Sequence, residues 1–301
     1  MNALLAGLVA IFLWGGVLPV VKIACEGGGA LMALAVIQGL AGLIGVALML
    51  ATGRLPLASR IYLNKWYWIR LALYAAHIIS IYFALNFVTR NHMPEVLFCN
   101  YLWPTFVLLY SALIAGVVVY RRRLFIIGLF FVVVALFVEI GLGGRSGHAA
   151  ASMTWNFWSS IGLAFSGAHA WGLYSALTRR FGEVSGGGAV VPTFMIIVSL
   201  VVGGVLFVQD GSLPLISSSF SFAVALAALS NVVAYWCWDY GMRHGDVVVL
   251  SLLADFIPWI SLTVTALALG VTVSGRTMIT AGVLVAGALI TRKGTIRPHV
   301  G

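Results

Sequence analysis

Charged residues are scarce in this 301-residue chain: only 8% are Asp, Glu, Lys or Arg, whereas 62% are hydrophobic. A soluble domain carries about a quarter charged residues, because a polar shell must cover its core. Too few charges are present here for such a shell, so lipid is expected to surround much of the molecule. Helices and closed barrels alone satisfy backbone polar groups inside a bilayer, and the long unbroken apolar runs favour helices.

Cysteine is also scarce, and recognisable catalytic motifs are missing. The three cysteines, Cys25, Cys99 and Cys237, lie far apart without CxxC spacing, so neither a metal site nor a disulfide framework is predicted. The chain contains no HExxH helix, Walker loop or GxSxG nucleophile turn, so no enzyme activity and no cofactor are predicted. The net charge of +9 comes from short basic loops rather than a continuous phosphate-binding face, so no nucleic-acid partner is expected.

A bilayer-spanning helix needs about 20 apolar residues. No basic leader precedes the first apolar run, so that run is expected to be retained. The sequence predicts ten transmembrane helices, near residues 3–23, 30–52, 67–89, 95–119, 124–142, 155–177, 188–208, 220–241, 247–270 and 276–292.

The orientation follows from the distribution of Lys and Arg. If the N-terminus is cytoplasmic, 13 of the 17 basic residues fall on the cytoplasmic side of these ten helices. Because cytoplasmic loops are enriched in Lys and Arg, both termini are predicted to lie inside. The predicted location is therefore the bacterial inner membrane, crossed several times.

An internal repeat divides the chain into residues 1–147 and 148–301, with five predicted helices in each half. The ordered matches are Tyr82 with Tyr235, Asn86 with Asp239, Arg90 with Arg243, Pro104 with Pro258, and Gly116 with Gly270. Trp14-Gly15 precedes Lys22 in the first half as Trp171-Gly172 precedes Arg179 in the second. Because five is odd, the two halves enter the membrane from opposite sides, which predicts two inverted-topology five-helix repeats.

Polar and aromatic residues within the predicted helices are candidates for a substrate site, because polar groups are costly in a membrane. The candidates are Trp14, His77, Tyr82, Asn100, Tyr101, Trp103, His169, Tyr174, Asn231 and Tyr235. Each could instead serve helix packing. Asp255 and Asp239 are candidates for charge coupling, although Asp239 could simply pair with Arg243 four residues later.

Proline and glycine suggest how the helices bend and pack. Pro104 and Pro258 occupy equivalent helix interiors, where proline removes a hydrogen bond, so both helices are predicted to kink and to act as hinges. Small residues at Gly39, Gly42 and Gly45, and at Gly282, predict close helix approaches.

With ten helices, a 5 + 5 repeat and internal termini, the chain resembles the drug/metabolite transporter superfamily with its EamA-type unit. The W-G-G-V-L-P-V-V-K stretch that starts at Trp14, together with the aromatic content, looks most like the YddG family of aromatic amino acid exporters. The resemblance implies a central cavity formed by predicted helices 1, 3, 4, 6, 8 and 9, with helices 5 and 10 peripheral. It also implies export by alternating access, with hinges at Pro104 and Pro258.

A small-molecule substrate, an aromatic amino acid in particular, is the expected partner besides the lipid bilayer, and no obligate protein partner is evident. Aromatic side chains could stack on the ring of such a substrate, while His77, Asn100 and Asn231 contact its charged end. Two alternatives remain open. A multidrug exporter would bind organic cations through aromatic faces and Asp255, and a membrane-embedded enzyme would need a convergent catalytic set.

Overall fold

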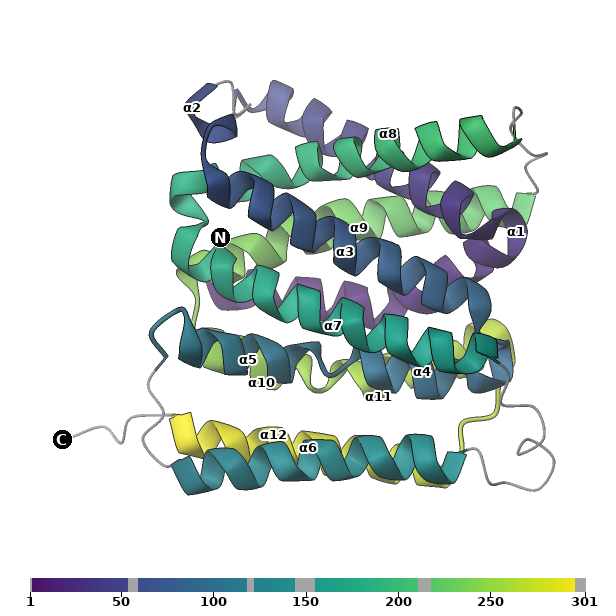
Figure 1. Cartoon of the computed structure of the whole chain (residues 1–301), viewed down its shortest axis with the longest axis vertical. Coiled ribbons are helices and arrows are strands. Elements are labelled where there is room, and N and C mark those ends of the chain that lie inside the picture. The colour runs from purple at the N-terminus through teal and green to yellow at the C-terminus, as the bar shows by residue number, and fades with distance from the viewer. Residues whose placement is uncertain (1, 54–58, 118–121, 144–154, 211–217, 296–301) are drawn as a thin grey trace.

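The computed structural model describes residues 2–53, 59–117, 122–143, 155–210 and 218–295. Regular secondary structure in these ranges is entirely helical, as predicted. Figure 1 shows the helices α1 (Ala3–Ala51), α2 (Ser59–Tyr62), α3 (Lys65–Phe87), α4 (Met93–Asn100), α5 (Trp103–Leu113), α6 (Arg122–Gly143), α7 (Trp155–Phe181), α8 (Val191–Asp210), α9 (Ser218–His244), α10 (Val247–Ala254), α11 (Ile257–Leu269) and α12 (Gly275–Thr295). The predicted boundary between the halves, at 147/148, lies outside the described residues.

Within the described ranges, six segments are long and apolar enough to cross a membrane: Ala3–Ala51, Lys65–Phe87, Arg90–Leu113, Glu183–Gln209, Ser218–His244 and Val247–Leu269. Large apolar side chains point outward from these segments, including Phe12 at 69% exposed and Leu267 at 82%. Such a surface suits lipid rather than water. These segments support the prediction of a helical membrane protein that crosses the bilayer several times. The count of ten helices and the inverted repeat remain predictions.

Helix α1 contains two of the predicted spans. Its 49 residues would extend over roughly 70 Å at 1.5 Å per residue, more than twice the hydrocarbon thickness of a bilayer. Gly29 interrupts the helical geometry with φ 77° and ψ 166°, a conformation that glycine adopts without a steric penalty. Figure 1 shows α1 turning back on itself, so Gly29 separates the predicted spans 3–23 and 30–52.

Each of the two predicted hinge prolines follows a short interruption of its predicted span. The predicted spans 95–119 and 247–270 each consist of two helices, α4 with α5 and α10 with α11. Pro104 and Pro258 each lie at the second position of the later helix. The missing proline N–H costs nothing there, because first-turn N–H groups have no partner within the helix. The helical pattern of both predicted spans is therefore interrupted just before each proline, at equivalent places, and the hinge role remains a prediction.

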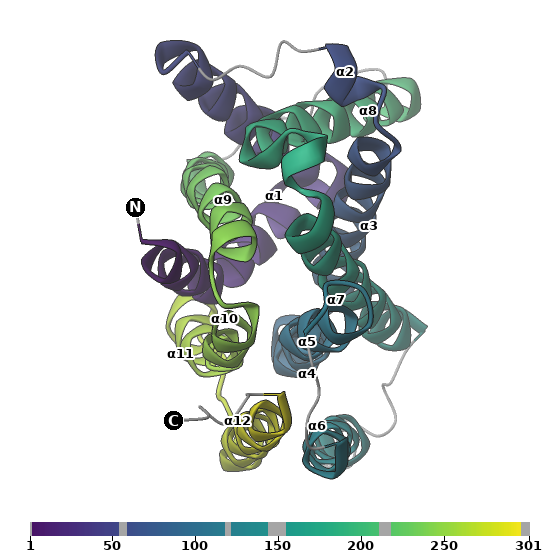
Figure 2. The same ribbon diagram turned by 90° about the vertical axis from the view of Figure 1, so that its left-hand side faces the viewer.

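Two groups of helices face each other across the middle of the molecule (Figure 2). We call the first the α1–α9 wall: the first part of α1 packs with α9, α10 and α11. The second is the α3–α7 wall, in which α7 packs on α3, α4 and α5. Helices α6 and α12 pack on one another at one end of the molecule, outside both walls (Figures 1 and 2).

Small residues permit close helix approaches where the sequence predicted them on α1. A Cβ atom at Gly39, Gly42 or Gly45 would lie 2.6 Å from a side chain of α8. Gly282 makes no such approach, because its nearest neighbour, Trp259, would be 3.8 Å away. The close contact of α12 is instead with Gly128 of α6, whose Cβ would lie 2.0 Å from the hydroxyl of Thr291.

Candidate functional site

A cavity lies between the two walls. Its lining includes eight of the ten predicted substrate residues: Trp14, His77, Tyr82, Asn100, Tyr101, Trp103, Asn231 and Tyr235. These side chains come from α1, α3, α4, α5 and α9 and from the break between α4 and α5. Trp14 and Tyr235, 221 positions apart in the sequence, thus meet around one space.

Trp14 stands at the centre of an aromatic cluster. Its ring centroid lies 5.8 Å from Trp103, 5.3 Å from Trp171 and 5.2 Å from Tyr235, each in an edge-to-face arrangement. This geometry places the positive ring edge against the negative face of its neighbour. Trp171 also stacks on Tyr174, with ring centroids 4.7 Å apart. The cavity lining is therefore largely aromatic, and its rings come from several helices.

Polar atoms are distributed sparsely around this apolar lining. Trp14 Nε1 and Asn100 Oδ1 are buried and make no hydrogen bond to another described residue. One is a donor and the other an acceptor. His77 Nδ1 lies 3.0 Å from the carbonyl oxygen of Gly167. Because a carbonyl can only accept, Nδ1 carries the proton and Nε2 remains an acceptor.

The cavity lining contains no Asp, Glu, Lys or Arg among the described residues. Its volume is about 40 Å³. This volume is the space open to the centre of a water-sized sphere, and one water needs at least about 10–15 Å³ of it. The cavity therefore accommodates a few waters but not an indole ring. Binding of an aromatic molecule therefore requires the walls to separate.

Four predicted residues lie elsewhere. His169 is exposed on α7, where its ring contacts the hydroxyl of Tyr110 and packs against Phe106. Tyr174 lies behind Trp171 and outside the cavity lining. Asp255 borders a second, smaller pocket of about 10 Å³ together with Pro104, Ser251 and Arg292.

Asp239 lies in an ion-pair network that we call the Asp239 cluster: Arg70, Glu183, Asp239 and Arg243. Arg70 Nη2 lies 2.7 Å from Asp239 Oδ1, and both side chains are at most 1% exposed. Arg243 Nε bonds the other carboxylate oxygen at 2.7 Å and also pairs with Glu183. The predicted Asp239–Arg243 pair is therefore present.

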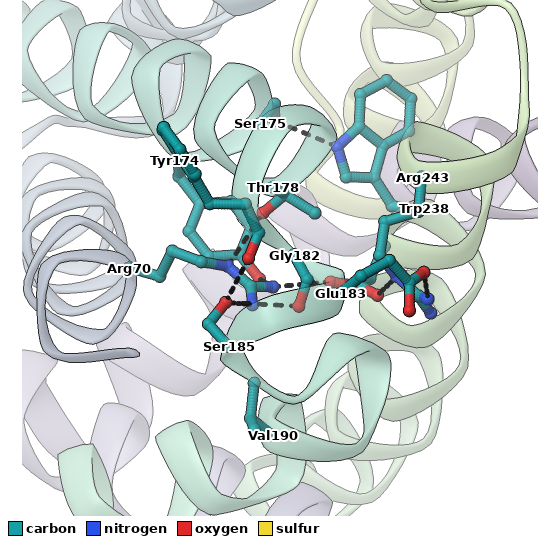
Figure 3. Close-up of polar contacts among 12 residues, drawn as sticks. Arg70, Tyr174, Ser175, Thr178, Gly182, Glu183, Ser185, Val190, Trp238 and Arg243 are labelled. Atoms are coloured by element: carbon teal, nitrogen blue, oxygen red, sulfur yellow. Dashed lines mark hydrogen bonds and ion pairs between the residues drawn. The ribbon is translucent and has the colours of Figure 1, made fainter. Parts of the chain in front are cut away.

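Arg70 has further partners, so its burial is fully compensated. Its guanidinium donates to the hydroxyls of Ser185 at 2.8 Å and Thr178 at 3.1 Å. Figure 3 shows Arg70 reaching these two hydroxyls on one side, with Arg243 and Glu183 beyond them. Buried charges that are paired and hydrogen-bonded in this way hold a defined arrangement of helices.

A second network, the Glu26 cluster, consists of Lys22, Glu26 and Arg90. Arg90 Nη2 lies 2.6 Å from Glu26 Oε2, and Lys22 Nζ lies 3.3 Å from Glu26 Oε1. Lys22 also donates to the carbonyl oxygens of Leu85 at 2.9 Å and Val88 at 2.6 Å. The cluster therefore attaches α1 to the carboxyl end of α3.

Residues 158–292 match the EamA-like transporter family. The chain is 29% identical to the aromatic amino acid exporter YddG of Salmonella typhimurium, with 89% of each chain covered. It is 27% identical to the Escherichia coli exporter of the same name, over 97% of this chain and 99% of the relative. The Ancylobacter novellus exporter is 25% identical, with 96% of each chain covered.

The predicted resemblance to EamA-type transporters is confirmed. A solved crystal structure supports the fold alone: it matches with a TM-score of 0.71 at 23% identity, over 100% of this chain and 99% of the other. The segment that matches this family begins in α7 and ends in α12. It contains the cavity residues Trp171, Asn231 and Tyr235.

Three important residues were not among the predicted site residues. Trp171 lines the cavity, and Trp238 packs against Trp14 with centroids 5.4 Å apart. The repeat was the available signal for Trp171, because Trp171 is the counterpart of Trp14. Arg70 was counted only among the basic residues that set the orientation in the membrane. Nothing in its local sequence distinguishes a buried arginine from an arginine in a cytoplasmic loop.

Proposed function

We propose that this chain is an inner-membrane exporter of aromatic amino acids and related small molecules that works by alternating access. The family match and the named relatives point to a membrane exporter rather than an enzyme. The finer parts of the proposal are ten helices in two inverted five-helix repeats and both termini in the cytoplasm.

The uncharged aromatic cavity is the observation that carries the proposed substrate class. An aromatic amino acid has no net charge near neutral pH, so a lining without charged side chains suits it. Its ring can pack edge to face against Trp14 and Trp103, as these rings already pack on each other. Its carboxylate needs donors such as Trp14 Nε1, and its ammonium needs acceptors such as Asn100 Oδ1.

The small volume of the cavity supports a transport cycle in which the helices move. About 40 Å³ leaves no space for a substrate ring. The two broken helices lie next to this space, and Pro104 and Pro258 stand at the equivalent breaks. We therefore retain both prolines as hinges about which the walls separate.

An organic-cation exporter is less well supported. Such a carrier would place an acidic side chain beside the substrate, but Asp255 borders the smaller pocket and Asp239 already pairs with two arginines. Asp255 remains a candidate for charge coupling at a distance from the substrate.

Counterflow in proteoliposomes that contain only this protein tests the proposal. Vesicles loaded with unlabelled tryptophan should accumulate labelled tryptophan, phenylalanine and tyrosine, but not lysine or glutamate. Chromatography of the accumulated label should recover the unchanged amino acid, which separates a carrier from an enzyme. Equal uptake in protein-free vesicles, or a preference for organic cations, would contradict the proposed substrate class.

A further inference from the structure

The two ion-pair clusters lie at opposite ends of the cavity. The helices α1 and α9 run antiparallel: a Cβ on Gly241 of α9 would meet Ala3, while a Cβ on Gly28 would meet Phe220. The Asp239 cluster is therefore beside the start of α1 and the Glu26 cluster is beside its interruption at Gly29. From Ala3 to Lys22 the helix rises roughly 30 Å, and the cavity residues Trp14 and Val17 lie between.

Each cluster connects the two walls. Lys22 and Glu26 belong to α1, which is part of the α1–α9 wall. Their partners lie at the carboxyl end of α3, in the α3–α7 wall: Arg90 follows that helix, and Lys22 contacts carbonyl groups at its end. At the other end, Asp239 of α9 bonds Arg70 of α3. Neither end can widen unless the ion pairs that join its two walls separate.

The glutamate and one arginine of each cluster also match in sequence position. Glu183 follows Glu26 by 157 positions, which is also the spacing from Trp14 to Trp171, and Arg243 follows Arg90 by 153. Both glutamate–arginine pairs are formed in the structure.

The third pair of counterparts makes the same kind of contact. Lys22 donates to carbonyl groups at the end of α3, and Arg179 donates to the carbonyl oxygens of Met242 at 3.2 Å and Gly245 at 2.8 Å, at the end of α9. A glutamate, an arginine and a carbonyl-binding cation therefore recur at both ends.

We propose that the Glu26 cluster and the Asp239 cluster each close one end of the cavity, and that transport proceeds by opening one while the other stays intact. This inference rests on the proposed alternating-access function and names the contacts that would perform it. The positive-inside count predicts that the Glu26 cluster faces the periplasm and the Asp239 cluster faces the cytoplasm.

Thiol labelling of one cavity residue tests the inference. Val17→Cys would be introduced after Cys25, Cys99 and Cys237 are replaced by alanine, and a membrane-impermeant maleimide would be applied to sealed vesicles of both orientations without substrate. Glu26→Gln should raise the labelling rate from the Glu26 face by up to about fivefold, which corresponds to about 1 kcal/mol. Asp239→Asn should raise labelling from the opposite face alone.

Three further variants keep the experiment decisive. Glu183→Gln removes a partner of Arg243 at an exposed site, so it reports on the Asp239 end even if Asp239→Asn fails to insert. The exchange of charges in Glu26→Arg with Arg90→Glu should restore slow labelling. Asp246→Asn is the matched control, because Asp246 caps α10 near the Asp239 end without joining the cluster, and asparagine caps equally well.

Labelling that rises from the same face in both sets of variants, or in neither set, would overturn the inference. Because no substrate is present, the result is independent of the proposed substrate class. If each set of variants raises labelling from its own face but no aromatic amino acid is transported, the two clusters still close the cavity and the proposed export function is wrong. If aromatic amino acids are transported but the variants do not raise labelling from opposite faces, the export function stands and the role of the two clusters is wrong.

Discussion

The two ends of the cavity use the same chemistry in different surroundings. At the Asp239 end, Arg70 and Asp239 are 0% and 1% exposed, whereas at the Glu26 end Arg90 and Glu26 are 50% and 31% exposed. The sequence counterpart of Asp239 is Asn86, which is exposed and uncharged, so the position equivalent to Asp239 carries no carboxylate at the Glu26 end. Equivalent positions in a repeat therefore need not contribute equally to stability.

Burial explains why the two ends should differ. Removing one partner of a buried pair leaves an uncompensated charge and costs about 3–5 kcal/mol, while an exposed pair contributes about 0–1 kcal/mol. The Asp239 end is thus expected to open less readily than the Glu26 end. In the unmodified carrier, a thiol at Val17 should be labelled faster from the Glu26 face.

The largest effect is expected from the buried pair. Arg70→Met should lower the free energy of unfolding in detergent by about 3–5 kcal/mol, because Asp239 loses its fully buried partner. Arg70→Met combined with Asp239→Leu should recover part of that loss, since no buried charge remains unpaired. Tryptophan fluorescence during denaturant titration measures both. A loss below about 1 kcal/mol in the single variant would show that the pair is not buried in the protein.

A smaller effect is expected in the middle of the molecule. Trp103→Ala should weaken binding of an aromatic amino acid by roughly 0.5–1.5 kcal/mol per lost ring pair, beyond the lost apolar area. Trp155→Ala is the matched control, because Trp155 is 84% exposed and outside the cavity. Equilibrium binding to the purified carrier measures both variants. Equal affinities would remove Trp103 from the substrate site.

The exposed pair should contribute less to stability. Glu26→Gln is expected to change the free energy of unfolding by no more than about 1 kcal/mol, and the change should shrink at high salt because exposed charges are screened. The comparison with Arg70→Met at two salt concentrations measures the difference between the ends. A salt-independent loss as large as that of Arg70→Met would contradict the distinction.

The smallest effect on substrate affinity is expected from Asp255→Asn. Asp255 borders a separate pocket, so the variant should retain the affinity and selectivity of the cavity. If Asp255 couples charge to transport, flux should lose its dependence on pH. Transport with an unchanged pH profile would leave Asp255 with a structural role, and uncoupled export would then be favoured.

The sequence predicted most of the helices because long apolar runs bounded by charged or glycine-rich segments leave few alternatives in a bilayer. It also predicted eight cavity residues, since polar atoms inside such runs need partners within the protein. Helical periodicity could not reveal that Pro104 and Pro258 follow breaks, because proline is compatible with both a kink and a helix start.

Long-range pairing was the other limit. Arg70 and Asp239 lie 169 positions apart and meet only through the packing of α3 beside α7 and α9. His169 shares the polar character of the cavity residues, yet the rotation of α7 places it on the exterior. Both outcomes depend on which face of a helix is turned inward, and the local sequence of an apolar helix specifies that face weakly.

The uncharged aromatic cavity is the central claim, and three molecules with the same ring test it directly. Tryptophan is a zwitterion, tryptamine is a cation, and indole-3-propionate is an anion near neutral pH. Competition of each with labelled tryptophan in proteoliposome counterflow compares their charges while the indole remains constant. A cavity without charged side chains predicts that tryptophan competes best and that both charged analogues are weaker. Stronger competition by tryptamine would contradict the account and would favour an organic-cation exporter.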